Sequence, residues 1–192
     1  MVLSMIKSRM RGTTDDVGGF SLAELCMLLC IAMMLAAFAV PTLSTSMRSM
    51  QLAADARNIA TTLTCARLSA TSQMTRYRLS FNLTDNQWSL EKFNKSTATF
   101  EVQQAANKLA NGIADSGIAF KSSSSSAPSG LPTTSSNAIT FNSRGVPIDA
   151  TGVPTADNVI YISKADTDYA VGVSLAGKVQ IWKLRDGQWI TQ

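Results

Sequence analysis

A single carboxylate, Glu24, stands at the front of a long apolar segment. The run behind it, Leu25–Val40, contains no charged residue. A charge held in an apolar environment is costly unless an opposite charge is paired with it, and an ionisable residue in a segment of membrane length is a functional-site candidate by default. We therefore expect Glu24 to pair with a positive group. The alternative is that Glu24 lies at a membrane interface, where lipid headgroups solvate it.

Few other residues could support catalysis or metal binding. The sequence has no histidine, which removes the commonest general base and the commonest metal ligand. Asp166 and Asp168 could share a calcium ion, but two carboxylates in a turn are more often a solvated loop. No phosphate-binding loop or dinucleotide fingerprint occurs. We expect no enzyme activity, no cofactor and no bound metal.

The three cysteines fit neither a disulfide framework nor a zinc site. Cys26 and Cys30 lie one turn apart in the apolar segment, where they behave as small hydrophobes. Cys65 stands alone, and a functional thiol there is a minor alternative.

Basic and aromatic residues near the C-terminal end raise nucleic-acid binding as a hypothesis. Lys178, Lys183 and Arg185 lie close in sequence to Trp182 and Trp189, and such combinations can bind single strands. Alternation along a strand would place Lys178 on one face and the other two cations on the opposite face. The net charge of only +4 argues against DNA binding, because nucleic-acid-binding domains are usually strongly basic.

The apolar segment predicts a membrane-crossing helix. Residues 20–43 are about long enough to cross a bilayer core. Three basic residues in front of them predict that the N-terminal side stays cytoplasmic: Lys7, Arg9 and Arg11. The small pair Gly18-Gly19 precedes the segment, whereas a secretory signal carries its cleavage site behind the apolar region. Cleavage after Gly19 would make this segment the mature N-terminus, and cleavage after Ala39 is the alternative.

The helix is expected to continue past Pro41, with a kink or local loosening at that proline. Residues 44–73 would form its amphipathic second half, and Asp55 is assigned to a face away from the apolar stripe. The apolar residues recur at helical spacing and should pack on a globular domain: Leu52, Ala56, Ile59, Ala60 and Leu63.

Residues 74–192 are predicted to form a β-rich domain. A two-residue turn at Asp85-Asn86 would pair Leu83 with Trp88 and Phe81 with Leu90. Segment 103–111 is left open between a short helix and a loop. The serine-dominated segment 122–136 is predicted to be a flexible loop that buries no apolar surface. Other strands are expected near 97–102, 118–120, 138–142, 159–163, 169–175, 178–184 and 189–190.

Two groups of motifs resemble the pilin-like proteins. Gly19, Phe20, Leu22 and Glu24, followed by an apolar helix with Pro41, look like the prepilin signature of type IV pilins and type II secretion pseudopilins. The stretches Ile-Thr-Phe-Asn-Ser-Arg-Gly at 139–145 and Leu-Ala-Gly-Lys-Val at 175–179 resemble the GspH/FimT branch. The resemblance implies a pilin-like α+β fold, in which a long N-terminal helix, transmembrane in its first half, packs on a C-terminal antiparallel β domain.

The resemblance also implies a route of assembly. A prepilin peptidase would remove the leader, residues 1–19, by cutting between Gly19 and Phe20, and would usually methylate Phe20. Glu24 would then pair with the new amine of Phe20 on a neighbouring subunit. The protein would wait in the inner membrane, in contact with lipid, as a single-pass protein with an extracytoplasmic domain.

From there it would join a type IV pilus or a type II secretion pseudopilus as a minor subunit. The implied partners are other pilins or pseudopilins, an inner-membrane assembly platform and a cytoplasmic assembly ATPase. Two alternatives stay open. One is a DNA-binding minor pilin for DNA uptake that uses Lys178, Lys183 and Arg185, and the other is a simple membrane-anchored β domain.

Overall fold

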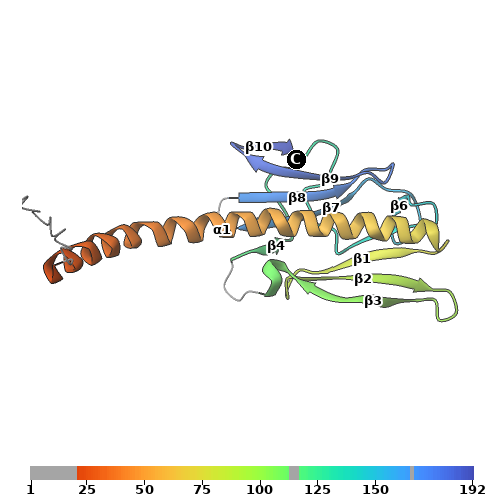
Figure 1. Cartoon of the computed structure of the whole chain (residues 1–192). Coiled ribbons are helices and arrows are strands. Elements are labelled where there is room, and N and C mark those ends of the chain that lie inside the picture. Colours follow the sequence, from red (N-terminus) through yellow and green to blue (C-terminus); the bar gives the residue numbers. More distant parts are fainter. Residues whose placement is uncertain (1–20, 113–116, 165–166) are drawn as a thin grey trace, which may run out of the picture. The chain divides into compact units, whose positions relative to one another are not determined.

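The long helix α1 (Leu22–Ser72) enters both of the compact units into which the chain divides, 1–43 and 44–192 (Figure 1). The computed structural model describes residues 21–112, 117–164 and 167–192, and it leaves the side chains of 38–49 and 111–112 outside the description. The helix assignment continues through Pro41. The predicted kink there falls where side chains are not described, so it stays a prediction.

The unit 44–192 holds two five-stranded sheets, and every pair of neighbouring strands is antiparallel. The first sheet runs in the order β3 (Thr99–Lys108), β2 (Gln87–Asn94), β1 (Tyr77–Asn82), β5 (Ala138–Phe141) and β6 (Pro147–Ile148). The second runs in the order β10 (Gln188–Thr191), β9 (Val179–Arg185), β8 (Thr167–Val173), β7 (Asn158–Lys164) and β4 (Ala119–Lys121).

One face of the second half of α1 packs on both sheets. Four of the five residues of the predicted stripe are fully buried and the fifth, Ala60, is partly buried, while Ala66 and Ala70 extend the stripe by two more turns. The same core takes inward-facing side chains from the first sheet, such as Leu79 and Phe141, and from the second, such as Val171. Small residues at helical spacing let the sheets approach the helix backbone, so this helix is the spine of the domain.

The first hairpin confirms the predicted faces but corrects the predicted register. Phe81 lies opposite Trp88 and Leu79 lies opposite Leu90, whereas the prediction paired Leu83 with Trp88. The strands have therefore slipped by two residues. Because side chains alternate with a period of two, a slip of two returns each side chain to its original face. Phe81 and Trp88 are accordingly both buried.

The cause of the slip is a longer turn than the two residues expected. Residues 83–86 connect the strands. The side-chain carbonyl of Asn82 accepts the N–H groups of Thr84 and Asp85, each at 3.0 Å, and Asn86 has a φ of 53°. An asparagine that bonds the backbone ahead of it offers an alternative to the strand ladder. Strand β1 therefore ends at Asn82.

Segment 103–111, left open between helix and loop, is mostly strand. Strand β3 continues to Lys108, and a short 3₁₀ helix, η1 (Leu109–Gly112), follows it. The register between β2 and β3 shifts near Leu90, which marks a bulge. The two alanines and two glutamines of its strand part, residues 103–108, have little strand preference. Pairing with β2 therefore decides the conformation, and tertiary contacts override the local propensity.

The serine-rich loop, residues 122–136, is packed rather than free, which corrects the predicted flexible loop. Its ends are joined by a bridge between Ser123 and Thr134. The Tyr161 hydroxyl donates a hydrogen bond to the carbonyl of Pro132 at 2.7 Å, and Leu131 packs against an apolar cluster on the outer face of the second sheet. The cluster contains Val159, Tyr161, Ala170, Trp182 and Trp189. This face is apolar, so the loop stabilises the domain by covering it.

Candidate functional site

The first turn of α1 places Glu24 at the start of the helix. The carbonyl of Ser21 accepts the N–H of Leu25 at 3.1 Å, and Glu24 is the acidic residue of this turn. A carboxylate is stabilised there by the partial positive charge of the helix N-terminus. The Glu24 side chain is exposed, and the sequence has no other Asp, Glu, Lys or Arg until Arg48. Any charge-specific contact of residues 21–37 therefore depends on Glu24.

Apolar side chains cover the rest of this part of α1 on every side. The exposed ones are Leu22, Leu25, Met27, Leu28, Leu29, Ile31, Met33, Met34 and Leu35. A surface helix of a globular domain shows one apolar stripe, whereas a helix that is apolar all round is normally covered by a core or a membrane. Consecutive exposed leucines and methionines therefore indicate a helix that requires lipid or neighbouring helices around it.

In the part of the chain that the structure describes, no helix holds a stretch long and apolar enough to cross a membrane. The expected membrane segment 20–43 reaches beyond that part at both ends, to Phe20 and to the side chains of 38–43. Gly19 and Phe20, the predicted processing residues, also lie outside the described residues. The cleavage site and the membrane helix stay predictions.

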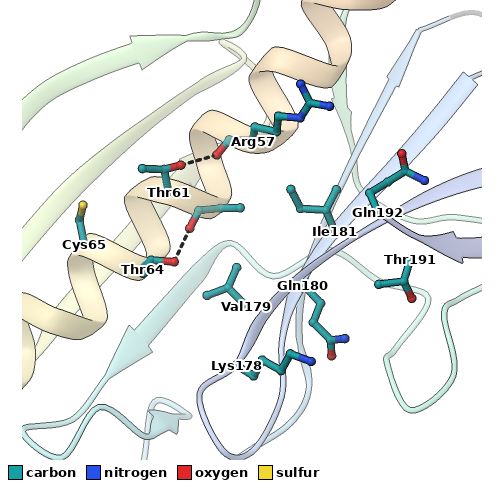
Figure 2. A pocket seen from close by; sticks show the side chains of 11 residues that line it. Arg57, Thr61, Thr64, Cys65, Lys178, Val179, Gln180, Ile181, Thr191 and Gln192 are labelled. Atoms are coloured by element: carbon teal, nitrogen blue, oxygen red, sulfur yellow. Dashed lines mark hydrogen bonds between the residues drawn. The ribbon is translucent and has the colours of Figure 1, made fainter.

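The three basic residues considered for DNA fall into two separate places. Lys178 lines a groove of about 560 Å³ between α1 and β9, together with Arg57, which the sequence analysis did not single out (Figure 2). Lys183 and Arg185 line a different cavity. The Lys183 ammonium lies 5.7 Å from the centroid of the Tyr169 ring. A joint DNA contact by all three cations stays a prediction, and Lys178 lines a different cavity from the other two.

The two turns that carried the GspH/FimT resemblance meet at one helix residue, Arg67. Its Nε donates to the carbonyl of Gly145 at 3.2 Å, and its Nη2 donates to the carbonyl of Ala176 at 3.3 Å. Gly145 and Gly177 have φ angles of +74° and +76°, and the position of a Cβ on Gly177 would lie 2.5 Å from the Gly145 carbonyl oxygen. The glycines are therefore required where two turns and the helix converge.

The sequence analysis misplaced Asp55, which is buried instead of lying on another face of the helix. It is 4% exposed, and its Oδ2 accepts the N–H of Ala110 at 2.6 Å. Burial raises the pKa of Asp55 above its usual value, while the bond from Ala110 acts in the opposite direction. The spacing Leu52, Asp55, Ala56, Ile59 was the available signal, since it puts Asp55 inside the stripe.

The carboxylate of Asp168 is already paired. The ammonium of Lys121 donates to both of its oxygens at 2.8 Å, and Asp166 lies outside the described residues. Among the described residues, no three Cys, Asp or Glu side chains are close enough to one another to hold a metal ion. Cys65 is exposed on α1 and lines the same groove as Lys178.

The comparison with known families gives a match to the domain and not to the apolar part of the helix. A model of the family described as type II transport protein GspH matches residues 55–177. The chain belongs to the GspH family. Membership in this family of transport proteins confirms the pilin-like recognition and the expectation of a non-enzymatic structural subunit. A search of curated proteins gave no match.

Two solved structures resemble the GspH-family chain, both of the minor pseudopilin EpsH from the type II secretion system of Vibrio cholerae. The first has 11% identity and a TM-score of 0.47, and the alignment covers 72% of this chain and 99% of that one. The second has 9% identity and a TM-score of 0.45, and covers 68% and 92%. The α+β architecture expected of a pilin-like protein is observed directly in the helix and two antiparallel sheets.

Proposed function

We propose that this GspH-family chain is a minor subunit of a type II secretion pseudopilus and acts by assembly, not by catalysis. The family match over 55–177 supports the type II system over a type IV pilus. The observation that carries the assembly role is the exposed, uniformly apolar helix over 22–35, which holds a single carboxylate. Such a helix is stable only when lipid or other apolar helices surround it.

The proposed route begins in the inner membrane. Residues 20–43 anchor the protein, the N-terminal side is cytoplasmic and the β domain is extracytoplasmic. The prepilin peptidase cuts between Gly19 and Phe20 and methylates the new amine of Phe20. The assembly platform then passes the subunit from lipid to a bundle of neighbouring pseudopilin helices. Because lipid or neighbouring helices surround the apolar surface at each stage, little of that surface is exposed to water during the transfer.

Glu24 sets the register in this proposal. A helix covered only with apolar side chains can slide along its neighbours at little cost, because one apolar contact replaces another. One carboxylate that finds the amine of Phe20 on a neighbouring subunit removes this freedom, since every other register leaves a charge unpaired in an apolar environment. The contact therefore selects an axial position in addition to any stabilisation that it provides.

The processing step is tested by the intact mass and N-terminal sequence of the protein purified from its own membranes. We expect a chain that begins at N-methylated Phe20. A start at Val40, or an uncut Met1, would exclude the pseudopilin route and leave a secreted or anchored β domain.

The role of Glu24 is tested by Glu24→Gln, which keeps the size of the side chain and removes its charge. Loss of a buried charge pair weakens an interface by several kcal/mol, so the amount of variant that co-purifies with pseudopili should fall at least about tenfold. Cys26→Ala is the matched control, because it alters the same apolar segment without changing charge. Normal co-purification of Glu24→Gln, or an equal loss with Cys26→Ala, would contradict the register role.

A further inference from the structure

The first sheet has an outer face that points away from α1 and is accessible to solvent. Side chains alternate between the two faces of a strand, and Leu79 and Leu90 belong to the core that includes α1. The serine-rich loop covers the outer face of the second sheet, whereas Val102 on the first sheet is 60% exposed. The strand pairing puts one set of residues, on or next to β1, β2 and β3, on this outer face: Arg76, Arg78, Glu91, Phe93, Phe100 and Val102.

Two arginines and two phenylalanines form a ladder on this face. The rings of Phe93 and Phe100 meet edge to face, with their centroids 5.3 Å apart and an angle of 64° between their planes. The guanidinium carbon of Arg76 lies over the Phe93 ring, 5.6 Å from its centroid, and that of Arg78 lies over the Phe100 ring at 3.9 Å. A guanidinium can lie on an aromatic ring and still donate its N–H groups to a further partner. The two rings therefore position both guanidiniums in advance.

The charges on this face leave Arg76 without a counter-charge. The Nε of Arg78 donates to the buried carboxylate of Glu91, so this pair is neutral. Among the described residues, no carboxylate forms an ion pair with Arg76. Lys95 adds a second cation nearby in the chain, because its ammonium donates to the carbonyl of Met74 at 3.4 Å. A negatively charged partner would complement this end of the face.

The acidic residues of the neighbouring segments have other partners. The turn that contains Gly152 lies beside Arg76, because a Cβ on that glycine would lie 4.0 Å from the Arg76 Nη2. Asp149, in the same turn, accepts two backbone N–H groups and one hydroxyl of its own turn. Glu101, on the other face of β3, accepts the side-chain amide of Asn94 at 2.6 Å. The guanidinium of Arg76 is therefore available to a carboxylate from outside the domain.

We propose that this outer face is a docking surface for a partner protein that presents a carboxylate beside an apolar side chain. Arg76 donates to the carboxylate, and the apolar side chain packs on Val102 and on the exposed parts of the two phenylalanine rings. Arginine and aromatic residues are enriched in protein interfaces, and a guanidinium can hold a carboxylate through two parallel hydrogen bonds. The surface lies wholly in the unit 44–192, so it can be tested whether or not the helix-bundle contacts proposed above occur.

A single-stranded nucleic acid is the less suitable occupant of this surface. Its bases would need open aromatic faces on which to stack, but a guanidinium already lies over each ring. A base that displaced Arg78 from Phe100 would also separate it from Glu91 and leave a buried carboxylate unpaired, which is costly. A carboxylate-bearing partner uses the N–H groups of Arg76 and leaves the ladder intact.

The test uses the full-length protein in detergent and a fluorescent peptide of leucine and valine that contains two glutamates. Anisotropy reports binding, and detergent micelles without protein give the blank. Two matched peptides replace both glutamates with glutamine or with lysine. Hydrogen bonds to charged groups contribute about 1.5–3 kcal/mol, so the glutamine peptide should bind at least about tenfold more weakly than the glutamate peptide.

Protein variants then locate the contact. Arg76→Gln should weaken the glutamate peptide at least about tenfold, whereas Arg144→Gln, which removes the same charge from an exposed turn outside this face, should not. Phe93→Leu should also weaken binding, because it removes the ring beneath Arg76. Arg76→Glu should reverse the preference and favour the lysine peptide. Unchanged unfolding curves in urea would show that these variants keep their fold.

Three results would overturn the proposal. One is an equal affinity of Arg76→Gln and Arg144→Gln for the glutamate peptide, since the contact would then not depend on Arg76. Another is the absence of saturable binding below about 1 mM. The third is tighter binding of single-stranded DNA than of the glutamate peptide, which would make this face a nucleic-acid surface.

Discussion

Gly177→Ala should destabilise the domain more than any ordinary loop substitution. The φ of Gly177 is +76°, where a side chain costs about 1–2 kcal/mol. An added Cβ would also lie 2.5 Å from the Gly145 carbonyl oxygen and 2.9 Å from the Arg67 Nε. Because the first of these contacts is with backbone, the turn itself must move, and overpacking of this kind costs about 1–3 kcal/mol more. The expected loss is therefore about 2–5 kcal/mol.

Gly187→Ala is a matched control within the same sheet. Gly187 has the same φ of +76°, but nothing lies within 4 Å of the position that its Cβ would occupy. This variant should lose only the conformational cost of about 1–2 kcal/mol. The difference between the two variants, about 1–3 kcal/mol, measures the close approach of the two turns and not the φ angle.

Urea unfolding of a fragment that begins at Ser44 would provide the numbers, because residues 44–192 are a compact unit. The buried Trp88 reports unfolding. For a domain of this size, each kcal/mol lowers Tm by about 2–4 °C, which gives a second reading. Equal losses for Gly177→Ala and Gly187→Ala would show that the turns are not tightly packed on Arg67, and would refute the explanation of the two motifs.

The remaining predictions concern buried ionisable groups. Burial raises the pKa of Asp55, so its contribution to stability is complete below pH 3.8 and is lost as the pH rises through the raised pKa. Asp55→Asn keeps an acceptor for the Ala110 N–H. Its free energy of unfolding, measured in urea and compared with that of the wild type, should therefore increase over that pH range. A difference that does not change with pH would contradict this. Burial raises the pKa of Tyr161 to about 12. The wild type should therefore lose stability between about pH 10 and 12 more steeply than Tyr161→Phe. At neutral pH that variant should lose about 1 kcal/mol with its hydrogen bond to Pro132, and equal alkaline profiles would refute the assignment.

Periodicity in the sequence predicted the elements well where one apolar pattern met one partner. The stripe from Leu52 to Leu63 was expected on a buried face, and four of its five residues are fully buried. Even the error in the first hairpin preserved the faces, because a slip of two residues leaves the pattern unchanged. The register itself was lost because the side chain of Asn82 lengthened the turn, and alternation does not encode turn length.

Contacts between distant segments could not be predicted in this way. Serine-rich composition indicated a free loop, but the outward face of β7 and β8 is apolar and the loop covers it through Leu131. Nothing in the sequence distinguished Arg67 from any other polar helix residue, because its two hydrogen-bond partners lie 78 and 109 residues away. Such sites depend on which segments the sheets bring together, and the sequence of either segment alone contains little of that information.

The assignment of family and the mechanism of assembly rest on different parts of the chain. The match to the GspH family begins at residue 55, inside the second half of α1, whereas the proposed mechanism depends on Phe20, Glu24 and the apolar residues behind them. The two can therefore fail separately. Loss of filament incorporation in Glu24→Gln with an unchanged unfolding curve would place assembly in the apolar helix alone. If Gly177→Ala reduces incorporation only in proportion to the folded fraction, the β domain contributes to incorporation through its fold, and the contacts that build the filament belong to the helix.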